Sequence, residues 1–525
     1  MERPAASVAV VGAGTMGSGI AQLAARSGAA TLLFDPLDAA LETGLERARD
    51  GLEREARRGR ITAEQAAAAA GRLAPAAALE DFKDCELVIE AIPERLELKH
   101  ELFAALSPIV GAGCVLATNT SSLPVTAVAA GAQRPERVVG MHFFNPAPVM
   151  ALVEVIAGVL SAPAALELVD ATGRAMGKTV IRAADGPGFL VNRCNRPFGL
   201  EGLRLLAERV ADVETIDRVC RLGGGFPMGP FELMDLVGVD TGLAVSESFY
   251  ELSFGEPRWR PSPITARQVA AGLLGRKSGR GYYTYTKGDD GKLRYRDEDT
   301  ESAPAPSTPE GDVVIAGETP LARELAQAAR AAGYEVHGAD EVASAGVLPA
   351  LSIDCRPVRT PGPAPAGGAR LMLCAGAPLA MLDRGGAVGF HALPPFDGVR
   401  VVEMTRRADS SPLAAARAER FFASLGRRVQ WVGDAPGLVL GRIVCQLINE
   451  AAFALGEGVG SAADIDLGMR LGLAHPRGPF EWAQAIGLEH VLAVLDGLWA
   501  LSREERYRAA PLLRTAAESG VPLHD

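Results

Sequence analysis

A histidine and a glutamate stand in two neighbouring apolar segments of this chain. His142 follows the apolar run 138–141, and Glu154 comes twelve residues later, inside the run 152–156. If these segments are adjacent strands, the carboxylate can fix the imidazole tautomer and stabilise its cation, as a general base requires. The two residues could also be a core histidine and a glutamate on a solvated strand face. The pair alone leaves both interpretations open.

A second candidate site lies near the start of the chain. An apolar run ends in Gly12-Ala13-Gly14-Thr15-Met16-Gly17, and residues of helical spacing follow. Strand, tight turn and helix in this order are what a dinucleotide site requires. Gly12 permits the turn, Gly14 lets the backbone approach a pyrophosphate, and Gly17 lets the helix lie close to the strand. The free N–H groups and positive dipole end of the helix favour phosphate.

An acid at the end of the next apolar run indicates which dinucleotide binds. Asp35 follows Leu32-Leu33-Phe34, at about the 20-residue distance that is typical of the ribose-binding acid. Its carboxylate would accept hydrogen bonds from ribose hydroxyls and repel a 2′-phosphate. The sequence therefore predicts NAD rather than NADP, and favours dinucleotide binding over a glycine turn without a ligand.

Composition bounds the class of protein. A chain of 525 residues is too long for one core and predicts two to four domains. The net charge of −11 argues against non-specific nucleic-acid binding. Seven scattered cysteines, without metal-ligand spacing, indicate reduced thiols and no metal site. With no signal-peptide pattern and no apolar stretch near the roughly 20 residues of a membrane span, we expect a cytoplasmic protein without a membrane partner.

The elements that must position these residues follow from the same patterns. Residues 38–74 are predicted to form two helices, 85–92 and 115–118 buried strands, and 189–274 a largely helical region. Asn119 and Ser121 then follow a strand, at the end where open α/β sheets bind ligands. We predict an α/β fold in which a doubly wound Rossmann domain over 1–185 precedes an all-α domain over 186–295.

Six motifs resemble those of the 3-hydroxyacyl-CoA dehydrogenase family and cover residues 5–285 without an evident break. They are Gly-Ala-Gly-Thr-Met-Gly at 12–17, Glu-Ala-Ile-Pro-Glu at 90–94, Asn-Thr-Ser-Ser-Leu at 119–123, His-Phe-Phe-Asn-Pro at 142–146, Pro-Gly-Phe-Leu-Val-Asn-Arg at 187–193 and Pro-Met-Gly-Pro-Phe-Glu-Leu at 227–233. The resemblance implies an NAD-binding Rossmann domain, a helical domain like that of 6-phosphogluconate dehydrogenase, and reversible oxidation of a (3S)-3-hydroxyacyl-CoA to the 3-oxoacyl-CoA.

The resemblance also implies roles for individual residues. His142 would take the hydroxyl proton with Glu154 orienting it, while Ser121 and Asn192 would hold the substrate oxygen. The expected cofactor contacts are Gly12, Gly14, Thr15, Met16, Gly17, Asp35, Glu94, Lys99, Asn119, Asn145 and Lys277. Arg58 belongs to a basic cluster between the two predicted helices and would contact the CoA nucleotide. A solvated basic face is the alternative for that cluster.

Beyond a linker at 296–312, rich in charge and proline, the chain repeats itself. The run 313–317 mimics the first strand, and Gly317 precedes Asp340 by 23 residues, as Gly12 precedes Asp35. Thr319 and Ala322, however, replace the second and third glycines. A side chain therefore stands where a pyrophosphate should approach, and we predict no NAD there.

A constant offset of 249 residues pairs His142 with His391 and Glu154 with Glu403. The oxygen-binding and loop residues do not survive: the positions opposite Asn192, Asn145 and Ser121 hold Gly441, Pro394 and Arg370. We predict a degenerate Rossmann-like domain over 313–433 and a second helical domain over 434–525, with a structural role rather than a second active site.

The family also suggests an arrangement for the helical domains, which pair two subunits into a dimer in its members. We expect residues 434–525 to lie on 186–290 within one chain as a pseudo-dimer, with further homo-oligomerisation left open. A chain cut at the linker tests this, since an N-terminal fragment that stays soluble, monomeric and fully active would contradict it.

The acyl group is the least defined feature. The chain length and fused second copy resemble bacterial dehydrogenases of phenylacetate and related aromatic degradation, which act on 3-hydroxyadipyl-CoA. The 3-hydroxybutyryl-CoA dehydrogenases of short-chain fatty acid metabolism and β-oxidation are the close alternative. An arginine facing the acyl tail would favour the dicarboxylate. A dehydrogenase of free hydroxy acids and a crystallin-like homologue without acyl-CoA activity are further alternatives, and no enoyl-CoA hydratase domain is visible.

Overall fold

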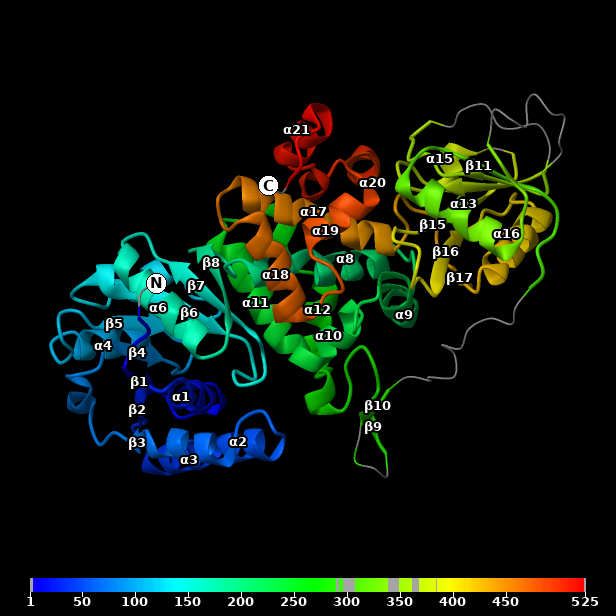
Figure 1. Ribbon diagram of the computed structural model, residues 1–525. Coiled ribbons are helices and arrows are strands. Elements are labelled where there is room, and N and C mark those ends of the chain that lie inside the picture. The colour runs from blue at the N-terminus through cyan, green and yellow to red at the C-terminus, as the bar shows by residue number, and fades with distance from the viewer. Residues whose placement is uncertain are drawn as a thin grey trace. The chain divides into compact units, whose positions relative to one another are not determined.

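The computed structural model describes residues 3–288, 291, 293–295, 307–338, 349–360, 368–383 and 385–523. The chain divides into two units (Figure 1). The first contains Met1–Arg193 together with Glu457–Leu473, and the second contains Cys194–Gly456 together with Ala474–Asp525. A short segment from late in the chain therefore belongs to the same unit as the N-terminal domain.

The first unit is built on an eight-stranded sheet of order β3-β2-β1-β4-β5-β6-β7-β8. Neighbouring strands run parallel except β6 and β7, which are antiparallel. This order places β1 between β2 and β4, as in a doubly wound dinucleotide-binding domain, and confirms the Rossmann-like fold. The strands are β1 (Ser7–Val11), β2 (Ala30–Phe34), β3 (Leu73–Pro75), β4 (Leu87–Glu90), β5 (Val115–Thr118), β6 (Val138–Phe143), β7 (Leu152–Ala157) and β8 (Thr179–Ala184).

Helices cover both faces of this sheet. Alternate residues of β1 enter two different cores, because Val8 and Val10 lie with Ile20 in one cluster while Ala9 and Val11 lie with Phe82 in the other. The helices are α1 (Thr15–Ser27), α2 (Asp38–Arg57), α3 (Ala63–Gly71), α4 (Leu96–Leu106), α5 (Val125–Ala129), α6 (Pro163–Ala175), α7 (Val191–Cys194) and α18 (Ala462–Leu473). The two helices predicted for 38–74 are α2 and α3, which run side by side beside α1 (Figure 1).

Although α18 belongs to the first unit, the second unit contains most of the helices that follow the two Rossmann-like domains. Its helices are α8 (Arg196–Ala207), α9 (Val213–Gly224), α10 (Pro230–Val237), α11 (Val239–Leu252), α12 (Pro263–Ala270), α17 (Leu440–Gly456), α19 (Pro479–Ile486), α20 (Leu488–Ser502) and α21 (Pro511–Ser519), and β9 (Thr286–Lys287) and β10 (Leu293–Arg294) form a hairpin.

A buried ionic cluster joins α8 to α17 in this unit. Arg442 of α17 lies 2.6 Å from Glu201 of α8 and 2.9 Å from the hydroxyl of Tyr507. Arg442 and Glu201 are almost completely buried, and a charge pair in that setting needs its partner. Helices from the two halves of the chain therefore pack against each other within this unit.

The second unit also contains a seven-stranded sheet of order β12-β11-β13-β14-β15-β16-β17. Its β15–β16 pair is antiparallel and its other pairs are parallel, which repeats the first sheet. The elements are β11 (Val313–Ala316), β12 (Val336–His337), β13 (Leu351–Asp354), β14 (Ala369–Leu373), β15 (Val388–His391), β16 (Val401–Thr405), β17 (Arg428–Trp431), α13 (Pro320–Ala332), α15 (Leu379–Leu382) and α16 (Pro412–Ser424).

The connection after the second strand differs in length between the two copies. Residues 338–350 join β12 to β13, whereas 35–86 join the corresponding β2 and β4 and carry α2, α3 and β3. The shorter connection in the second copy has too few residues for helices as long as α2 and α3. Asp340, predicted to correspond to Asp35, and residues 296–306 of the linker lie outside the described residues.

Among the described residues, no single helix is long and apolar enough to cross a membrane. The consecutive helices α19 and α20 meet the length and composition criteria only together, and a 101° bend separates them.

Candidate active site

The three glycines of the first loop are required for different reasons. Gly12 has φ +100°, and a Cβ there would lie 2.5 Å from the carbonyl oxygen of Ala91. A Cβ on Gly17 would lie 1.7 Å from the carbonyl oxygen of Gly12. Gly14 is exposed, and a Cβ there would meet no protein atom within 4 Å. The fold therefore demands Gly12 and Gly17, while the open space at Gly14 fits an approaching ligand.

A pocket of about 930 Å³ opens beside this loop. Asp35 lines it, and its carboxylate accepts hydrogen bonds from the backbone N–H groups of Ala13 (2.9 Å) and Leu37 (3.1 Å). The predicted contacts Gly12, Gly14, Thr15 and Met16 line it as well. Arg47 of α2 also lines the pocket and was missed, because a basic residue in a charged helix carries no local signal of the face it presents.

The pairing of β6 with β7 sets His142 opposite Glu154. Nδ1 of His142 lies 2.6 Å from Oε2 of Glu154, whose side chain is fully buried. The other oxygen, Oε1, accepts the N–H groups of Leu190 (3.2 Å) and Val191 (3.0 Å). The alternative of a glutamate on a solvated face is therefore wrong. A carboxylate on Nδ1 favours a proton there and leaves Nε2 as an acceptor.

The turn before α7 aims these N–H groups at Glu154. Phe189 has φ +52°, which turns the chain so that Leu190 and Val191 present their N–H groups to the carboxylate. The rings of Phe144 and Phe189 lie 4.8 and 5.9 Å from the imidazole. Asn192 follows in α7 and is half-buried. The same turn thus fixes both the Glu154 donors and the Asn192 backbone.

The loop after β5 is held by Glu94. Its Oε1 accepts the Thr120 hydroxyl (2.6 Å) and the N–H groups of Ser121 (2.9 Å) and Ser122 (3.0 Å). Burial alone would raise the pKa of Glu94, but the Lys99 charge and these hydrogen bonds outweigh it and lower that pKa. The Ser121 side chain stays exposed at the carboxyl edge of the sheet.

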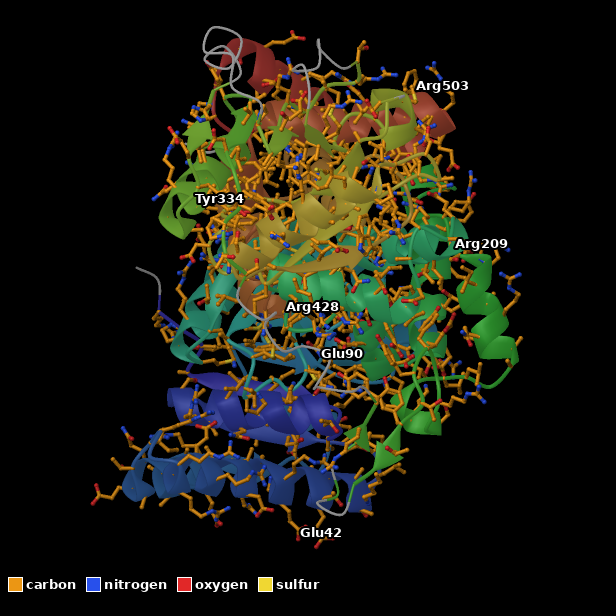
Figure 2. The ribbon with its side chains drawn as sticks, turned by 90° about the vertical axis from the view of Figure 1, so that its right-hand side faces the viewer. Glu42, Glu90, Arg209, Tyr334, Arg428 and Arg503 are labelled. Carbon is orange, nitrogen blue, oxygen red and sulfur yellow. The ribbon has the colours of Figure 1, made fainter. Side chains whose placement is uncertain are left out.

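Lys99 lies beneath this loop. Its ammonium is 2.6 Å from Glu90 and 3.3 Å from Glu94, and its side chain is 1% exposed. Glu90, labelled in Figure 2, is likewise buried at the end of β4. The Lys99 ammonium therefore contacts the Glu90 and Glu94 carboxylates instead of solvent.

The remaining predicted residues are less tightly grouped. Asn119 accepts the Phe143 N–H (2.8 Å) and so ties the end of β5 to the end of β6, where Asn145 is exposed. Arg58 is an exposed residue at the C-terminal end of α2. Lys277 lies in the second unit, where its ammonium is 2.7 Å from Asp240. The roles expected for these residues stay predictions.

The second copy keeps the geometry of Glu403 but not of its histidine. Glu403 accepts the N–H groups of Val439 (2.7 Å) and Leu440 (2.9 Å), as Glu154 accepts those of Leu190 and Val191. His391 is its register partner on β15, yet Nε2 of that ring lies 3.0 Å from Nε2 of His490. Within the described part of the chain, the buried Nδ1 of His391 has no hydrogen-bond partner.

The lack of a side chain at Gly441 gives the His391 ring the space for this orientation. A Cβ on Gly441, the position opposite Asn192, would lie 2.2 Å from Cε1 of His391. Burial and His490 lower the pKa of His391 well below its usual range, and burial raises the pKa of Glu403 to about 8. The second copy therefore lacks the histidine–carboxylate contact of the first.

The comparisons with known proteins extend this description to the whole chain. The family model described as "3-hydroxyacyl-CoA dehydrogenase, NAD binding domain" matches residues 7–186, and that of the C-terminal domain matches 188–285 and again 437–522. The 3-hydroxyadipyl-CoA dehydrogenase of Escherichia coli is 36% identical over 516 residues, 98% of each chain. A probable 3-hydroxybutyryl-CoA dehydrogenase of Bacillus subtilis is 43% identical over 278 residues, which are 53% of this chain and 96% of its own.

A solved structure described as 3-hydroxybutyryl-CoA dehydrogenase from Escherichia coli is similar to this chain over nearly its whole length. It superposes with a TM-score of 0.77 at 35% identity and covers 99% of this chain and 100% of its own. The matched residues include the glycine loop, His142 and Glu154, and the C-terminal domain model matches twice. The chain belongs to the 3-hydroxyacyl-CoA dehydrogenase family of NAD-dependent oxidoreductases.

Proposed function

We propose that the first half alone carries the reversible NAD-linked oxidation of a (3S)-3-hydroxyacyl-CoA, with His142 as the general base. The observation that carries this is the 2.6 Å contact between Nδ1 of His142 and the buried Glu154. His391 has exchanged the equivalent contact for one with His490.

In the oxidation direction, Nε2 of His142 accepts the proton of the C3 hydroxyl. Glu154 stabilises the resulting imidazolium, and the buried position of both groups strengthens their attraction. The Ser121 hydroxyl and the Asn192 amide hold the reacting oxygen as its charge changes. In the reverse direction His142 returns the proton to the oxygen of the 3-oxoacyl-CoA.

Bound NAD supplies the hydride acceptor, and the loop from Gly12 to Gly17 would hold its pyrophosphate. The open space at Gly14 and the pocket beside it fit that group. The Asp35 carboxylate accepts the N–H groups of Ala13 and Leu37, and its remaining lone pairs can accept hydrogen bonds from ribose hydroxyls. Asn119, Asn145, Glu94 and Lys99 belong to the proposed cofactor site, the last two by holding the Ser121 loop.

The CoA nucleotide is proposed to contact the α2–α3 hairpin. Arg58 is exposed there, and Arg47 adds a second cation, facing the pocket. Either guanidinium suits a phosphate because its planar donors match phosphate oxygens.

We propose 3-hydroxyadipyl-CoA, an intermediate of aromatic-ring degradation, as the substrate. The support is the Escherichia coli relative of that name, which shares the two-copy length. The 3-hydroxybutyryl-CoA of short-chain metabolism is the second candidate, favoured by the names of the Bacillus subtilis relative and the superposed structure.

The deciding experiment compares 3-oxoadipyl-CoA with acetoacetyl-CoA as substrates for NADH oxidation, with NADPH as a parallel cofactor. A larger kcat/KM for the adipyl substrate supports the dicarboxylate, and a larger value for acetoacetyl-CoA overturns it. Efficient use of NADPH would contradict the role of Asp35. Turnover of free 3-hydroxybutyrate without CoA would contradict the acyl-CoA assignment itself.

We also propose that the paired helical domains replace a homodimer interface within one chain. The buried contacts of Arg442 with Glu201 and Tyr507 support this arrangement.

The seven cysteines are free and buried, which suits the reducing cytoplasm we propose as the location.

A further inference from the structure

Residues 457–473, which we name the brace, come from the second half of the chain but belong to the first unit. The brace contains α18, which contacts strands β7 and β8. It thus lies on the part of the sheet that carries Glu154. Nothing in the local sequence of α18 predicts this distant partner.

Three glycines let the brace approach closely. A Cβ on Gly460 would lie 2.8 Å from Leu190, and one on Gly468 would lie 2.8 Å from Val191. A Cβ on Gly472 would lie 3.0 Å from Leu152 and 3.3 Å from Val191, and 3.4 Å from the ring of Phe144. Gly468 and Gly472 are four residues apart and share one face of α18.

Polar contacts fix the same interface. The N–H of Ala184 donates to the carbonyl oxygen of Val459 (2.8 Å), which joins the end of β8 to the brace. Arg193 lies 2.7 Å from Glu457, and the Arg193 side chain is only 6% exposed. Charge-assisted hydrogen bonds of this kind, with one partner buried, hold a geometry more strongly than exposed pairs do.

The residues that the brace contacts are those that build the proposed dyad. Leu190 and Val191 donate their N–H groups to Glu154, and Phe144 lies against His142. Asn192 stands between Val191 and Arg193, both of which the brace touches. We infer that the brace is a positioning element of the first-half catalytic centre, and that the chain retains its second half because that centre is incomplete without it. This inference rests on the proposed function.

The second unit contains the equivalent contacts of the repeat, at residue numbers shifted by 249, which we name the mirror set. Arg442 pairs with Glu208 (2.6 Å), as Arg193 pairs with Glu457. The N–H of Gly433 donates to Val210 (2.6 Å), and a Cβ on Gly223 would lie 3.2 Å from the Val401 carbonyl oxygen. This mirror set supports the unpaired His391, so it provides matched controls with the same chemistry at the other copy.

The experiment uses the full-length protein with four variants. G472V and E457A disturb the brace, while G223V and E208A make the same changes in the mirror set. We measure kcat, KM for acetoacetyl-CoA, Kd for NADH, Tm and the pH profile of kcat/KM. E457D, which retains the charge, serves as the rescue variant.

We expect G472V and E457A to lower kcat by about tenfold or more, since displacement of a catalytic group by about 1 Å can cost 10²-fold. NADH affinity should stay near that of the wild type, because the glycine loop lies on other strands. Loss of N–H donors leaves more negative charge on Glu154, which stabilises protonated His142. Because the reduction of acetoacetyl-CoA needs that protonated form, the alkaline limb of the pH profile should move to higher pH. E457D should recover most of kcat, and G223V and E208A should retain it despite a comparable fall in Tm.

Equal kcat loss in the brace and mirror variants at equal Tm loss, with an unmoved pH profile, would overturn the inference. So would brace variants with wild-type kcat. If G472V does not fold, the E457A and E457D pair decides alone. A wild-type protein that binds NADH but reduces no 3-oxoacyl-CoA would instead refute the proposed function, which separates the two failures.

Discussion

Replacement of Glu154 by glutamine probes the dyad at its most constrained atom. One carboxylate oxygen faces Nδ1 of His142, and the other accepts the N–H groups of Leu190 and Val191. Glutamine offers one acceptor oxygen and one NH₂ donor. If its oxygen still accepts the N–H groups of Leu190 and Val191, the NH₂ must face Nδ1.

The imidazole then has to change its tautomer. Nδ1 becomes the acceptor and the proton moves to Nε2, so the histidine can no longer take the proton of the hydroxyl. The analogous change in the Ser-His-Asp triad lowers kcat by about 10⁴, and a general base typically contributes about 10²–10⁴. We therefore expect E154Q to lose about 10²–10⁴ in kcat, or about 3–5 kcal/mol of transition-state stabilisation.

The assay follows the formation of NADH from NAD and (S)-3-hydroxybutyryl-CoA, the direction in which His142 accepts the proton, and NADH binding is measured separately by fluorescence. NADH affinity should be unchanged, since the cofactor loop lies at β1 and α1. The matched control is E403Q, which makes the same change at the unpaired copy and should leave kcat near the wild-type value. E154Q with more than about one tenth of the wild-type kcat would refute the tautomer argument.

Four further predictions test other parts of the description. H142A should lower kcat by at least about 10²-fold while NADH still binds, and wild-type-like turnover would remove His142 from the mechanism. G14V should weaken NADH binding with little change in Tm, because its Cβ meets no protein atom within 4 Å. G17A should lower Tm, because its Cβ would lie 1.7 Å from a carbonyl oxygen. A larger fall in Tm for G14V than for G17A, measured by calorimetry, would contradict the loop geometry. Burial raises the pKa of Glu403 from 4.5 to about 8, so the folded state holds its proton longer than the unfolded state and stability falls as pH rises through that window; E403Q does not titrate and should lose less Tm between pH 5 and pH 9, and parallel Tm curves would argue against a buried neutral carboxyl. Cleavage at an inserted protease site within 296–312 should leave the halves associated and active, and an N-terminal half that is separately monomeric and fully active would contradict both the pseudo-dimer and the brace.

Much of the first half could be predicted from the sequence because its signals are local. A strand, a glycine turn and a helix follow one another directly, so the Gly12–Gly17 loop is encoded in adjacent residues. The two helices of 38–74 follow from their residue pattern in the same way. His142 and Glu154 stand on consecutive strands, and a twelve-residue separation leaves few ways to pair them.

Other site features depend on contacts between distant segments. The resemblance implied that Lys99 contacts the cofactor, and only the tertiary structure shows that its buried ammonium lies between Glu90 and Glu94. Arg47 reaches the pocket only because α2 lies against α1, and the charge pattern of the helix does not say which face is inward.

By itself, the sequence determined the family, the cofactor class and the existence of a repeat, since motif spacing and the offset of 249 residues survive in the linear order. Only the tertiary structure decided that the His391 ring contacts His490 and occupies the space beside Gly441, although Glu403 is its register partner on the next strand. It also decided that α18 lies on the first-half sheet, with Arg193 and Glu457 paired across 264 residues. Both outcomes depend on which surfaces fit together once the chain has folded, and no local pattern of residues carries that information.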